Sequence, residues 1–203
     1  MGFYSRLIVP AALDWVMSGS TFSEYRRSLL ANISGTVLEI GVGTGLNLAH
    51  YPETVTHLTT IDVNPGMSRR AQARLAQLHC PTHHQVLNSE TLPMGNNTFD
   101  HVVSTWTLCS IAQVSQALAE IYRVLKPGGQ FHFIEHGLSD RPAVQIWQHR
   151  LTPLQKRIAD GCHLDRPIQA LIARQFATFT VEQFVMPDFP AVAGYTYKGV
   201  ATK

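Results

Sequence analysis

Short apolar runs alternate with longer, helix-like segments through most of this chain. Five runs rich in β-branched and other apolar residues read as buried strands: residues 36–40, 55–62, 82–87, 101–107 and 131–137. Between them, residues 66–79 and 114–124 read as helices, and a further helix is expected over residues 46–52. Because strand and helix keep alternating, the pattern predicts an α/β fold with a mainly parallel sheet.

The two ends of the chain depart from this alternation. Residues 1–34 read as a helical cap, and residues 142–160 as a polar helix. Residues 179–186 and 194–203 alternate between apolar and polar side chains, which predicts two strands that finish the sheet as a hairpin-like pair. With 203 residues, we expect one domain of ample core over residues 1–203.

Three glycines at alternate positions interrupt the first strand-like run. Gly41, Gly43 and Gly45 follow the apolar residues 37–40, so the chain reads as strand, tight turn and helix start. Backbone N–H groups at such a turn would face a ligand. The third glycine of a dinucleotide fingerprint would stand at position 46, where this chain has Leu46, so the motif is GxGxG and a nicotinamide dehydrogenase is disfavoured.

Two acidic residues stand at the ends of the first two predicted strands. Asp62 ends the second strand about twenty residues after the glycines, where a carboxylate can accept both hydroxyls of a ribose. Glu39 comes just before the glycine turn. The alternatives are a helix N-cap for Asp62, a solvated strand-end charge for Glu39, and a plain βα turn for the glycines.

These motifs resemble the class I S-adenosylmethionine-dependent methyltransferases, whose first motif is an acid followed by GxGxG. The segments after the third strand and around the LKPGG turn agree with this resemblance. It implies a Rossmann-like, seven-stranded, mainly parallel sheet with an antiparallel last strand, and S-adenosylmethionine as cofactor. The cofactor-binding residues that it implies are Glu39, Gly41, Gly43, Gly45, Asp62, Asn88, Ser89, Glu90 and Thr105. Many relatives have Asp at position 88, but the Asn88 amide oxygen can still accept a hydrogen bond.

The C-terminal third is similar to a narrower group. The IEHG strand end, a Trp-containing helix, the DGCHLDRP segment and a terminal GYTYKGVA strand resemble the methyltransferase-like 7 family of thiol S-methyltransferases and its bacterial relatives. The WTLCS segment at residues 106–110 fits the same group. The resemblance implies a small, apolar thiol acceptor. It also divides the chain into a helical cap (1–34), a cofactor-binding core (35–136) and a substrate-side part (137–203).

Composition narrows the partners and the compartment. The net charge is only +2, and the sequence has no concentrated basic stripe of the kind that nucleic-acid binding needs. Because 45% of the residues are hydrophobic and only 15% are charged, part of the surface could be an apolar channel. Three scattered cysteines indicate reduced thiols in the cytoplasm. The N-terminal apolar run is too short to span a bilayer, yet it could lie on a membrane surface, cover the cofactor or simply pack on the domain.

Methyl transfer to a thiol needs an acceptor sulfur with a free lone pair, so an imidazole near the cofactor is the expected helper. The candidate catalytic residues are His136, at the end of the fifth strand, and His163, with a structural histidine as the alternative for each. Cys162 adjoins His163, but no second ligand pair follows at zinc-like spacing, so no metal is expected.

Other functions stay open at this stage. Methylation of a quinone carbon or of a phospholipid amine would use the same glycine turn and LKPGG turn, and a non-catalytic cofactor-binding module would share the first motif. The sequence says nothing of the oligomeric state. Trp106, Trp147 and Phe189 are candidates for the wall of an apolar acceptor pocket, although aromatic residues also fill ordinary cores.

Overall fold

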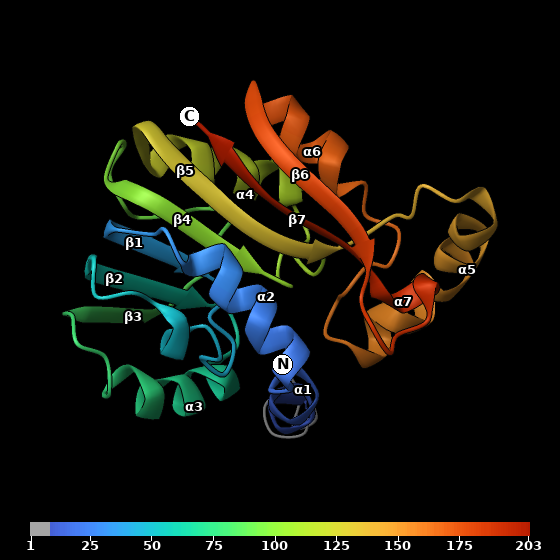
Figure 1. Cartoon of the computed structure of the whole chain (residues 1–203), viewed down its shortest axis with the longest axis horizontal. Coiled ribbons are helices and arrows are strands. Elements are labelled where there is room, and N and C mark those ends of the chain that lie inside the picture. Colours follow the sequence, from blue (N-terminus) through green and yellow to red (C-terminus); the bar gives the residue numbers. More distant parts are fainter. Residues whose placement is uncertain (1–8) are drawn as a thin grey trace.

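A single seven-stranded sheet organises the structure, a computed structural model that describes residues 9–203. The strand order is β3-β2-β1-β4-β5-β7-β6, as Figure 1 shows. The strands are β1 (Gly35–Ile40), β2 (Val55–Asp62), β3 (Thr82–Val86), β4 (Phe99–Thr105), β5 (Leu125–His136), β6 (Thr178–Val185) and β7 (Tyr195–Thr202). The α/β sheet predicted from the sequence is confirmed.

The first five strands are parallel, and β1 lies at the centre of this part between β2 and β4. The apolar side chains of β1, including Val37, Leu38 and Ile40, are almost fully buried because helices cover both faces of the sheet. Since parallel strands end on the same edge, the carboxyl ends of β1, β2, β4 and β5 meet there. This edge carries the candidate site.

Strand β7 runs antiparallel between β5 and β6. The antiparallel last strand that the resemblance implies is therefore confirmed. At the pairing of β5 with β7, Gly199 lies opposite Phe133. A Cβ atom at position 199 would come within 2.3 Å of the Thr180 carbonyl oxygen, so this central strand requires a glycine here.

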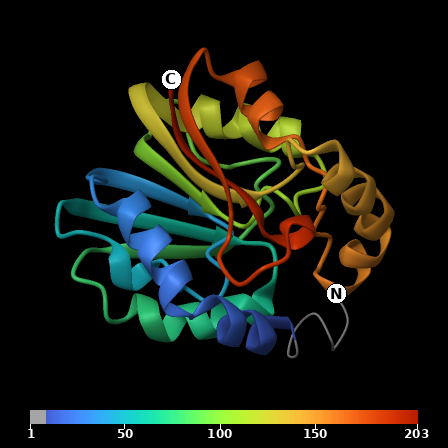
Figure 2. The ribbon, with the colours of Figure 1, turned by 45° about the vertical axis from the view of Figure 1, so that its right-hand side comes forward.

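The helices form layers on the two faces and one group beyond the edge. In Figures 1 and 2, α2 crosses one face, α4 and α6 lie behind the sheet, and α5 and α7 lie past the carboxyl ends of β4 and β5. The helices are α1 (Val9–Met17), α2 (Ser20–Leu30), α3 (Pro65–Leu75), α4 (Val114–Val124), α5 (Pro142–Ile158), α6 (Ile168–Gln175) and α7 (Ala191–Gly194). In the part of the chain that the structure describes, no helix is both long and apolar enough to cross a bilayer.

The helix expected over residues 46–52 is wrong. A single turn of 3-10 helix, η2 (Leu48–His50), stands there instead. The preceding residue, Asn47, donates a hydrogen bond from its side-chain amide to the buried carboxylate of Glu39, and Pro52 stands two positions after the end of the turn. A side chain held inward at the start and a proline at the end leave no room for a longer helix.

Candidate active site

One large cavity opens at the carboxyl edge of the sheet. Its volume is about 600 Å³, within the usual size of small-molecule sites. The walls come from α2, from the loops that follow β1, β2, β3 and β4, from the last residue of β5, and from α5 and α7. The lining therefore combines residues of the glycine turn with residues of the C-terminal third.

The glycine turn forms part of this cavity. Gly41 and Gly43 line it, both with positive φ, whereas Gly45 packs against Leu48 and Ala71 behind the lining. A Cβ atom on Gly41 would lie 2.1 Å from the Thr107 hydroxyl oxygen, so no larger residue fits. Because these positions have no side chain, a ligand in the cavity can approach the backbone closely. Turns that bind nucleotide cofactors need this close approach, whether or not the cofactor carries phosphate.

Asp62 lies where the sequence places it, at the end of β2 and on the cavity wall. Its two carboxylate oxygens accept hydrogen bonds from the backbone N–H groups of Gly43 (2.9 Å) and Asn64 (2.7 Å). Burial raises the pKa of Asp62, and these two hydrogen bonds oppose the shift. Because each oxygen keeps a second lone pair, the carboxylate can still accept two hydroxyl groups.

Glu39 acts behind the cavity wall. The residue is 1% exposed, and its carboxylate accepts hydrogen bonds from the Asn47 amide (2.9 Å) and the Tyr51 hydroxyl (2.9 Å). Burial raises the pKa of Glu39 to about 7. Asn47 also donates to the Thr105 hydroxyl oxygen (3.0 Å). Asn47 and Thr105 both line the cavity, so Glu39 reaches a ligand through Asn47. The solvated strand-end alternative for Glu39 is wrong.

The loop after β3 contributes Asn88, Ser89 and Glu90 to the cavity lining. The Asn88 amide oxygen accepts a hydrogen bond from the backbone N–H of Glu90 (3.0 Å), and its amide nitrogen donates to the Glu90 carboxylate (3.1 Å). The Asn88 side chain therefore shapes its own loop. Its oxygen has one further lone pair for a ligand.

Sequence reasoning missed Arg26, which projects from α2 into the cavity. Arg26 is 4% exposed, and its guanidinium donates to the Met17 carbonyl (2.7 Å) and lies 4.9 Å from the centre of the Trp106 ring. Burial lowers its pKa to about 10. Its Nε atom has no hydrogen-bond partner among the described residues, and neither has the Asn47 Oδ1 atom. Buried polar atoms without partners mark positions where a polar ligand is expected.

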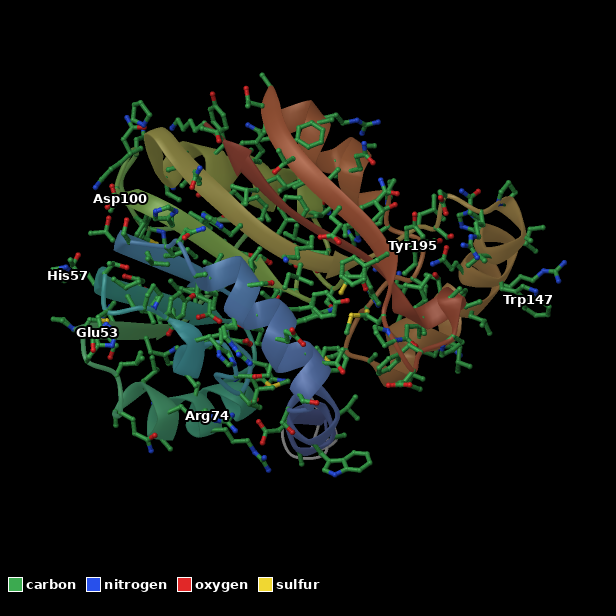
Figure 3. The ribbon with its side chains drawn as sticks, in the orientation of Figure 1. Glu53, His57, Arg74, Asp100, Trp147 and Tyr195 are labelled. Carbon is green, nitrogen blue, oxygen red and sulfur yellow. The ribbon has the colours of Figure 1, made fainter. Side chains whose placement is uncertain are left out.

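The aromatic side chains divide between cavity and surface. Trp106 and Phe189 line the cavity, and the Phe22 ring packs edge-on against both. Trp147 does not: it projects outward from α5 and is 53% exposed (Figure 3). Trp106 and Phe189 therefore lie on the pocket wall, as predicted. The prediction is wrong for Trp147, because α5 turns that side chain away from the sheet.

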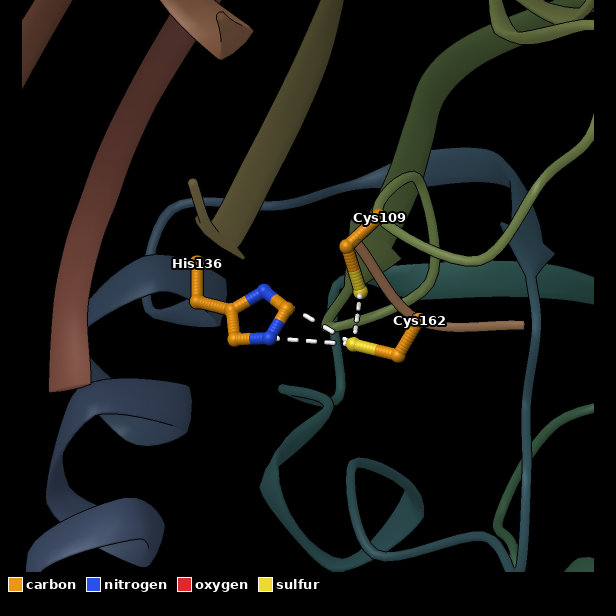
Figure 4. Close-up of side chains that lie close together, drawn as sticks. All are labelled: Cys109, His136 and Cys162. Atoms are coloured by element: carbon orange, nitrogen blue, oxygen red, sulfur yellow. Dashed lines mark hydrogen bonds between the residues drawn. The ribbon is translucent and has the colours of Figure 1, made fainter. Parts of the chain in front are cut away.

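Two cysteines and one histidine meet on the cavity wall, as Figure 4 shows. Cys109 follows β4, His136 is the last residue of β5, and Cys162 lies between α5 and α6. The two Sγ atoms are 3.4 Å apart, and the Cys162 Sγ atom is 3.0 Å from His136 Nε2. Hydrogen bonding from Cys162 and the nearby His136 lower the pKa of Cys109, and the Cys109–Cys162 hydrogen bond raises that of Cys162.

The same charges act on the imidazole. Burial opposes protonation of His136, but the charge and hydrogen bonding of Cys109, a backbone hydrogen bond and the charge of Glu135 together outweigh burial and raise the pKa of His136 to about 9. The carboxylate of the neighbouring Glu135 is fully buried and accepts from the backbone N–H groups of Thr107 and Cys109, which holds the turn after β4.

His163, the second candidate catalytic residue, is absent from the cavity lining. Its backbone N–H and its ring Nδ1 atom both contact the Cys109 carbonyl oxygen, at 3.0 and 3.1 Å, and the Arg166 guanidinium lies 2.9 Å from the same ring atom. His163 therefore ties the Cys109 loop to the Cys162 loop. In this place it can position the cysteines without touching a ligand.

Comparison with known proteins identifies the family. The methyltransferase domain family matches residues 38–133. The demethylmenaquinone methyltransferase of Lactiplantibacillus plantarum is 30% identical over 177 residues, which cover 81% of this chain and 75% of that protein. The chain belongs to the methyltransferase family.

Two further relatives of this methyltransferase are thiol S-methyltransferases. Rat TMT1B is 36% identical over 136 residues, covering 64% of the chain and 55% of that protein. Human TMT1A is 29% identical over 205 residues, covering 90% of the chain and 82% of that protein. The match with the rat protein thus spans little more than half of the relative's length.

A solved structure shows how general the fold is. The Haemonchus contortus phospholethanolamine N-methyltransferase 2, in complex with phosphomonomethylethanolamine and S-adenosylhomocysteine, superposes with a TM-score of 0.73 at 15% identity. The match covers 96% of this methyltransferase and 57% of that chain. At this identity the likeness concerns the fold alone. The chemistry of this methyltransferase must therefore be argued from its own cavity.

Proposed function

We propose that this chain transfers the methyl group of S-adenosylmethionine to the sulfur of a small, apolar thiol. The observation that carries the proposal is that two sets of residues line one cavity. The first set is the glycine turn and Asp62, and the second is Trp106, Phe189 and the two cysteines. The similarity to thiol S-methyltransferases, which extends over 90% of the chain for human TMT1A, supports a sulfur acceptor.

The chain is an S-adenosylmethionine-dependent methyltransferase, and the cavity residues fit that cofactor. Asp62 would accept the ribose hydroxyls, and Asn88, Ser89 and Glu90 would contact the adenine. The unpartnered Nε of Arg26 and Oδ1 of Asn47 would meet the carboxylate and the ammonium group of the methionine part. When bound, the cofactor supplies a methyl group already activated on a sulfonium.

The protein's own work is then placement and exclusion of water. Trp106, Phe189 and Met186 give the acceptor part an apolar lining, and we propose that this lining selects a small apolar molecule. His136 lies on the same wall and is the candidate catalytic residue, whereas His163 is a positioning residue. On this proposal residues 35–136 bind the cofactor and contribute Trp106 and Cys109 to the acceptor side, and residues 137–203 supply the rest of that side. From the N-terminal cap, Met17, Phe22 and Arg26 line the same cavity.

A quinone ring carbon is the second candidate acceptor. The demethylmenaquinone methyltransferase of Lactiplantibacillus plantarum is 30% identical to this chain, and the match covers three quarters of that protein. An apolar cavity wall would suit a quinone as well as a thiol. The sulfur-lined wall favours the thiol, because two cysteine side chains offer nothing specific to a ring carbon.

The test is the release of S-adenosylhomocysteine by the purified chain. Acceptors of equal chain length would be compared: an alkyl thiol, its matched alcohol, its matched amine and a short-chain demethylquinone, beside a control without acceptor. Turnover with the thiol alone is the expected result. Turnover with the quinone alone would transfer the assignment to carbon, and cofactor binding without any product would indicate a binding module.

We propose further that the protein contacts the surface of anionic membranes. On α1, Trp15 is 82% exposed and Val16 is exposed beside it; Phe3, Tyr4 and Arg6 lie outside the described residues. Helix α5 adds Ile146, Trp147, Leu151, Leu154 and Ile158 as exposed apolar side chains. The same helix carries Arg150, Lys156 and Arg157 and no acidic residue. Apolar side chains beside basic ones suit an anionic lipid surface.

Co-sedimentation with lipid vesicles tests this contact. Binding to vesicles rich in anionic lipid, and weaker binding to zwitterionic ones, is expected. The double variant W15S/W147S should bind less, whereas V86S, which changes an exposed apolar residue on the edge strand β3, should bind like the wild type. Equal partitioning of all three proteins would remove the membrane contact.

A further inference from the structure

Cys109 and Cys162 have no role yet in the proposed function beyond lining the cavity, and the candidate catalytic residue His136 lies beside them. These residues come from three separate segments, after β4, at the end of β5 and between α5 and α6. Their ligand atoms, two Sγ atoms and one imidazole nitrogen, all lie within 4.8 Å of one another. The two cysteines are 2% and 8% exposed, so the group is enclosed by protein except where it faces the cavity.

From this geometry we infer a zinc site, in which Cys109, Cys162 and His136 bind the ion and its fourth position opens into the cavity. Catalytic zinc typically has three protein ligands and one open position, and two cysteines with one histidine form one of the known ligand sets. The sequence predicted no metal because no ligand pair stands at zinc-like spacing. The folded sheet brings the ligands together from positions 109, 136 and 162 instead.

The distances suit an ion of this size. Zinc binds sulfur at about 2.3 Å and imidazole nitrogen at about 2.0 Å, so tetrahedral geometry places two sulfurs roughly 3.7 Å apart and a sulfur and a nitrogen roughly 3.5 Å apart. The observed separations are 3.4 Å between the sulfurs and 3.0 Å from Cys162 Sγ to His136 Nε2. These two pairs of ligand atoms need to separate by only roughly 0.3–0.5 Å to admit the ion.

Charge balance also favours an ion here. Two thiolates and a neutral imidazole around one divalent cation sum to zero, which lowers the cost of burying the charges. The loops that carry the cysteines are fixed to each other, because the Cys109 carbonyl oxygen accepts from the His163 backbone N–H (3.0 Å). Glu135 holds the backbone N–H of Cys109 (3.4 Å). Ligands held by such outer contacts lose little freedom when the ion binds.

The inferred site gives the proposed function its missing step, and it rests on that function for its substrate. A thiol that coordinates zinc loses its proton to solvent and becomes a thiolate. The thiolate sulfur would attack the methyl carbon of S-adenosylmethionine: the new S–CH3 bond forms as the old one breaks, and the bonding pair returns to the cofactor sulfur. The products are a methyl thioether and S-adenosylhomocysteine. The neutral thioether is a weak ligand and leaves the ion.

The first experiment measures metal directly. Untagged protein, stripped with a chelator under reducing conditions and then incubated with Zn²⁺, should retain one equivalent after desalting. Co²⁺ in its place should give thiolate-to-cobalt charge-transfer absorption. C109S and C162S should lower zinc affinity by more than about tenfold, since even outer contacts of such sites are worth 10 to 100-fold. C80S, which alters a cysteine outside the cavity lining, should match the wild type.

Two results would overturn the site. One is a wild-type protein that binds S-adenosylhomocysteine and retains no zinc with all three thiols reduced. The other is a C109S variant that binds zinc as tightly as wild type. Activity assays then separate the site from the proposed function. Equal thiol methylation by metal-free and zinc-loaded protein would overturn the role of the ion and leave the function standing. Zinc binding without methylation of any thiol would support the site and overturn the function.

Discussion

Arg26 is the residue that we expect to matter most for cofactor binding, yet it is the one that sequence patterns indicate least. It lies on α2, in a segment whose charged and apolar residues read as an ordinary amphipathic helix. Only the fold shows that, of the two adjacent arginines on α2, Arg26 is buried against Trp106 and Arg27 is exposed. A buried guanidinium with an unpartnered nitrogen is costly unless a ligand completes it.

We therefore predict that R26M weakens cofactor binding. Methionine keeps much of the volume but removes the charge, and a hydrogen bond to a charged group is worth about 1.5–3 kcal/mol, so the Kd of S-adenosylhomocysteine should rise tenfold or more. Isothermal titration calorimetry would measure it. R27M, the matched change on the exposed neighbour, should leave Kd unchanged. Equal Kd values for R26M and wild type would place the carboxylate of the methionine part elsewhere.

Glu39 carries a prediction about pH. Burial raises its pKa to about 7, from an ordinary value near 4.5. The folded state thus binds the proton more tightly than the unfolded chain, so the free energy of unfolding should fall as the pH rises from about 4.5 to 7 and stay level above that range. E39Q has no proton to lose at this position. We predict that it shows a smaller loss of stability between pH 5 and pH 7.5 than the wild type.

Urea denaturation at the two pH values would measure this loss. E53Q is the matched control, because Glu53 is exposed in the loop before β2 (Figure 3), and it should keep the wild-type dependence. Parallel pH profiles for E39Q and wild type would show that Glu39 stays ionised in the folded protein. In that case the hydrogen bonds from Asn47 and Tyr51, together with Arg26, would outweigh burial.

Much of the cofactor end could be predicted at the residue scale because its parts are local. Gly41, Gly43 and Asp62 follow their strands directly, and a strand ending in glycines or an acid is visible in the sequence. Gly45 and Glu39 belong to the same motif, yet the structure places both behind the cavity wall. A motif gives the order of residues along the chain, whereas packing decides which of them face a ligand.

At the scale of elements, strand β7 has the least tolerance for change. It pairs with β5 on one side and β6 on the other, so it cannot shift to make room. We predict that G199A lowers the free energy of unfolding by roughly 1–3 kcal/mol, the usual cost of overpacking, because its Cβ would meet Phe133 at 2.6 Å as well as the Thr180 carbonyl. Thermal or urea unfolding would measure the change.

G95A is the control for this substitution. Gly95 lies in the exposed loop before β4, and the nearest atom to an added Cβ, the Thr98 hydroxyl oxygen, is at 3.5 Å, an ordinary contact. Its unfolding should differ little from that of the wild type. If G199A were as stable as G95A, then β7 would have moved away from β6, and the pairing of the two last strands would be looser than this structure shows.

The helices were predicted well where their apolar residues recur on one face of the helix. The helix expected over residues 114–124 is α4, with the same bounds, because its apolar residues recur at helical spacing and pack on the sheet. The helix expected over residues 46–52 is wrong, because the hydrogen bond between Asn47 and Glu39 is tertiary and leaves no periodic signal. Local patterns cannot report a bond made across the turn.

At the scale of the whole molecule, no pattern in the sequence indicated that two cysteines and a histidine meet on the cavity wall. Cys109, His136 and Cys162 are 27 and 26 positions apart, and nothing in that spacing indicates a shared site. The parallel sheet brings the ends of β4 and β5 to one edge, and the segment after α5 closes over them. The strand order of the sheet brings such a site together, and no sequence motif encodes it.

The cavity joins the two halves of the chain, which leads to a prediction for the molecule as a whole. A ligand present at 100 times its Kd stabilises the folded state by about 2.7 kcal/mol. For a chain of this size that corresponds to a rise in melting temperature of roughly 5–10 °C. S-adenosylhomocysteine should produce this rise, and R26M should need a proportionally higher concentration for the same effect.

Hydrogen exchange would show where the stabilisation acts. Because the cavity is lined by the glycine turn at residues 41–47 and also by Gln155, Ala159 and Cys162, we expect S-adenosylhomocysteine to slow exchange in both regions. The exposed loop at residues 95–98, remote from the lining, serves as the internal control. Protection confined to the glycine turn would mean that the segment after α5 closes on the acceptor alone, and thiol and cofactor would then bind independently.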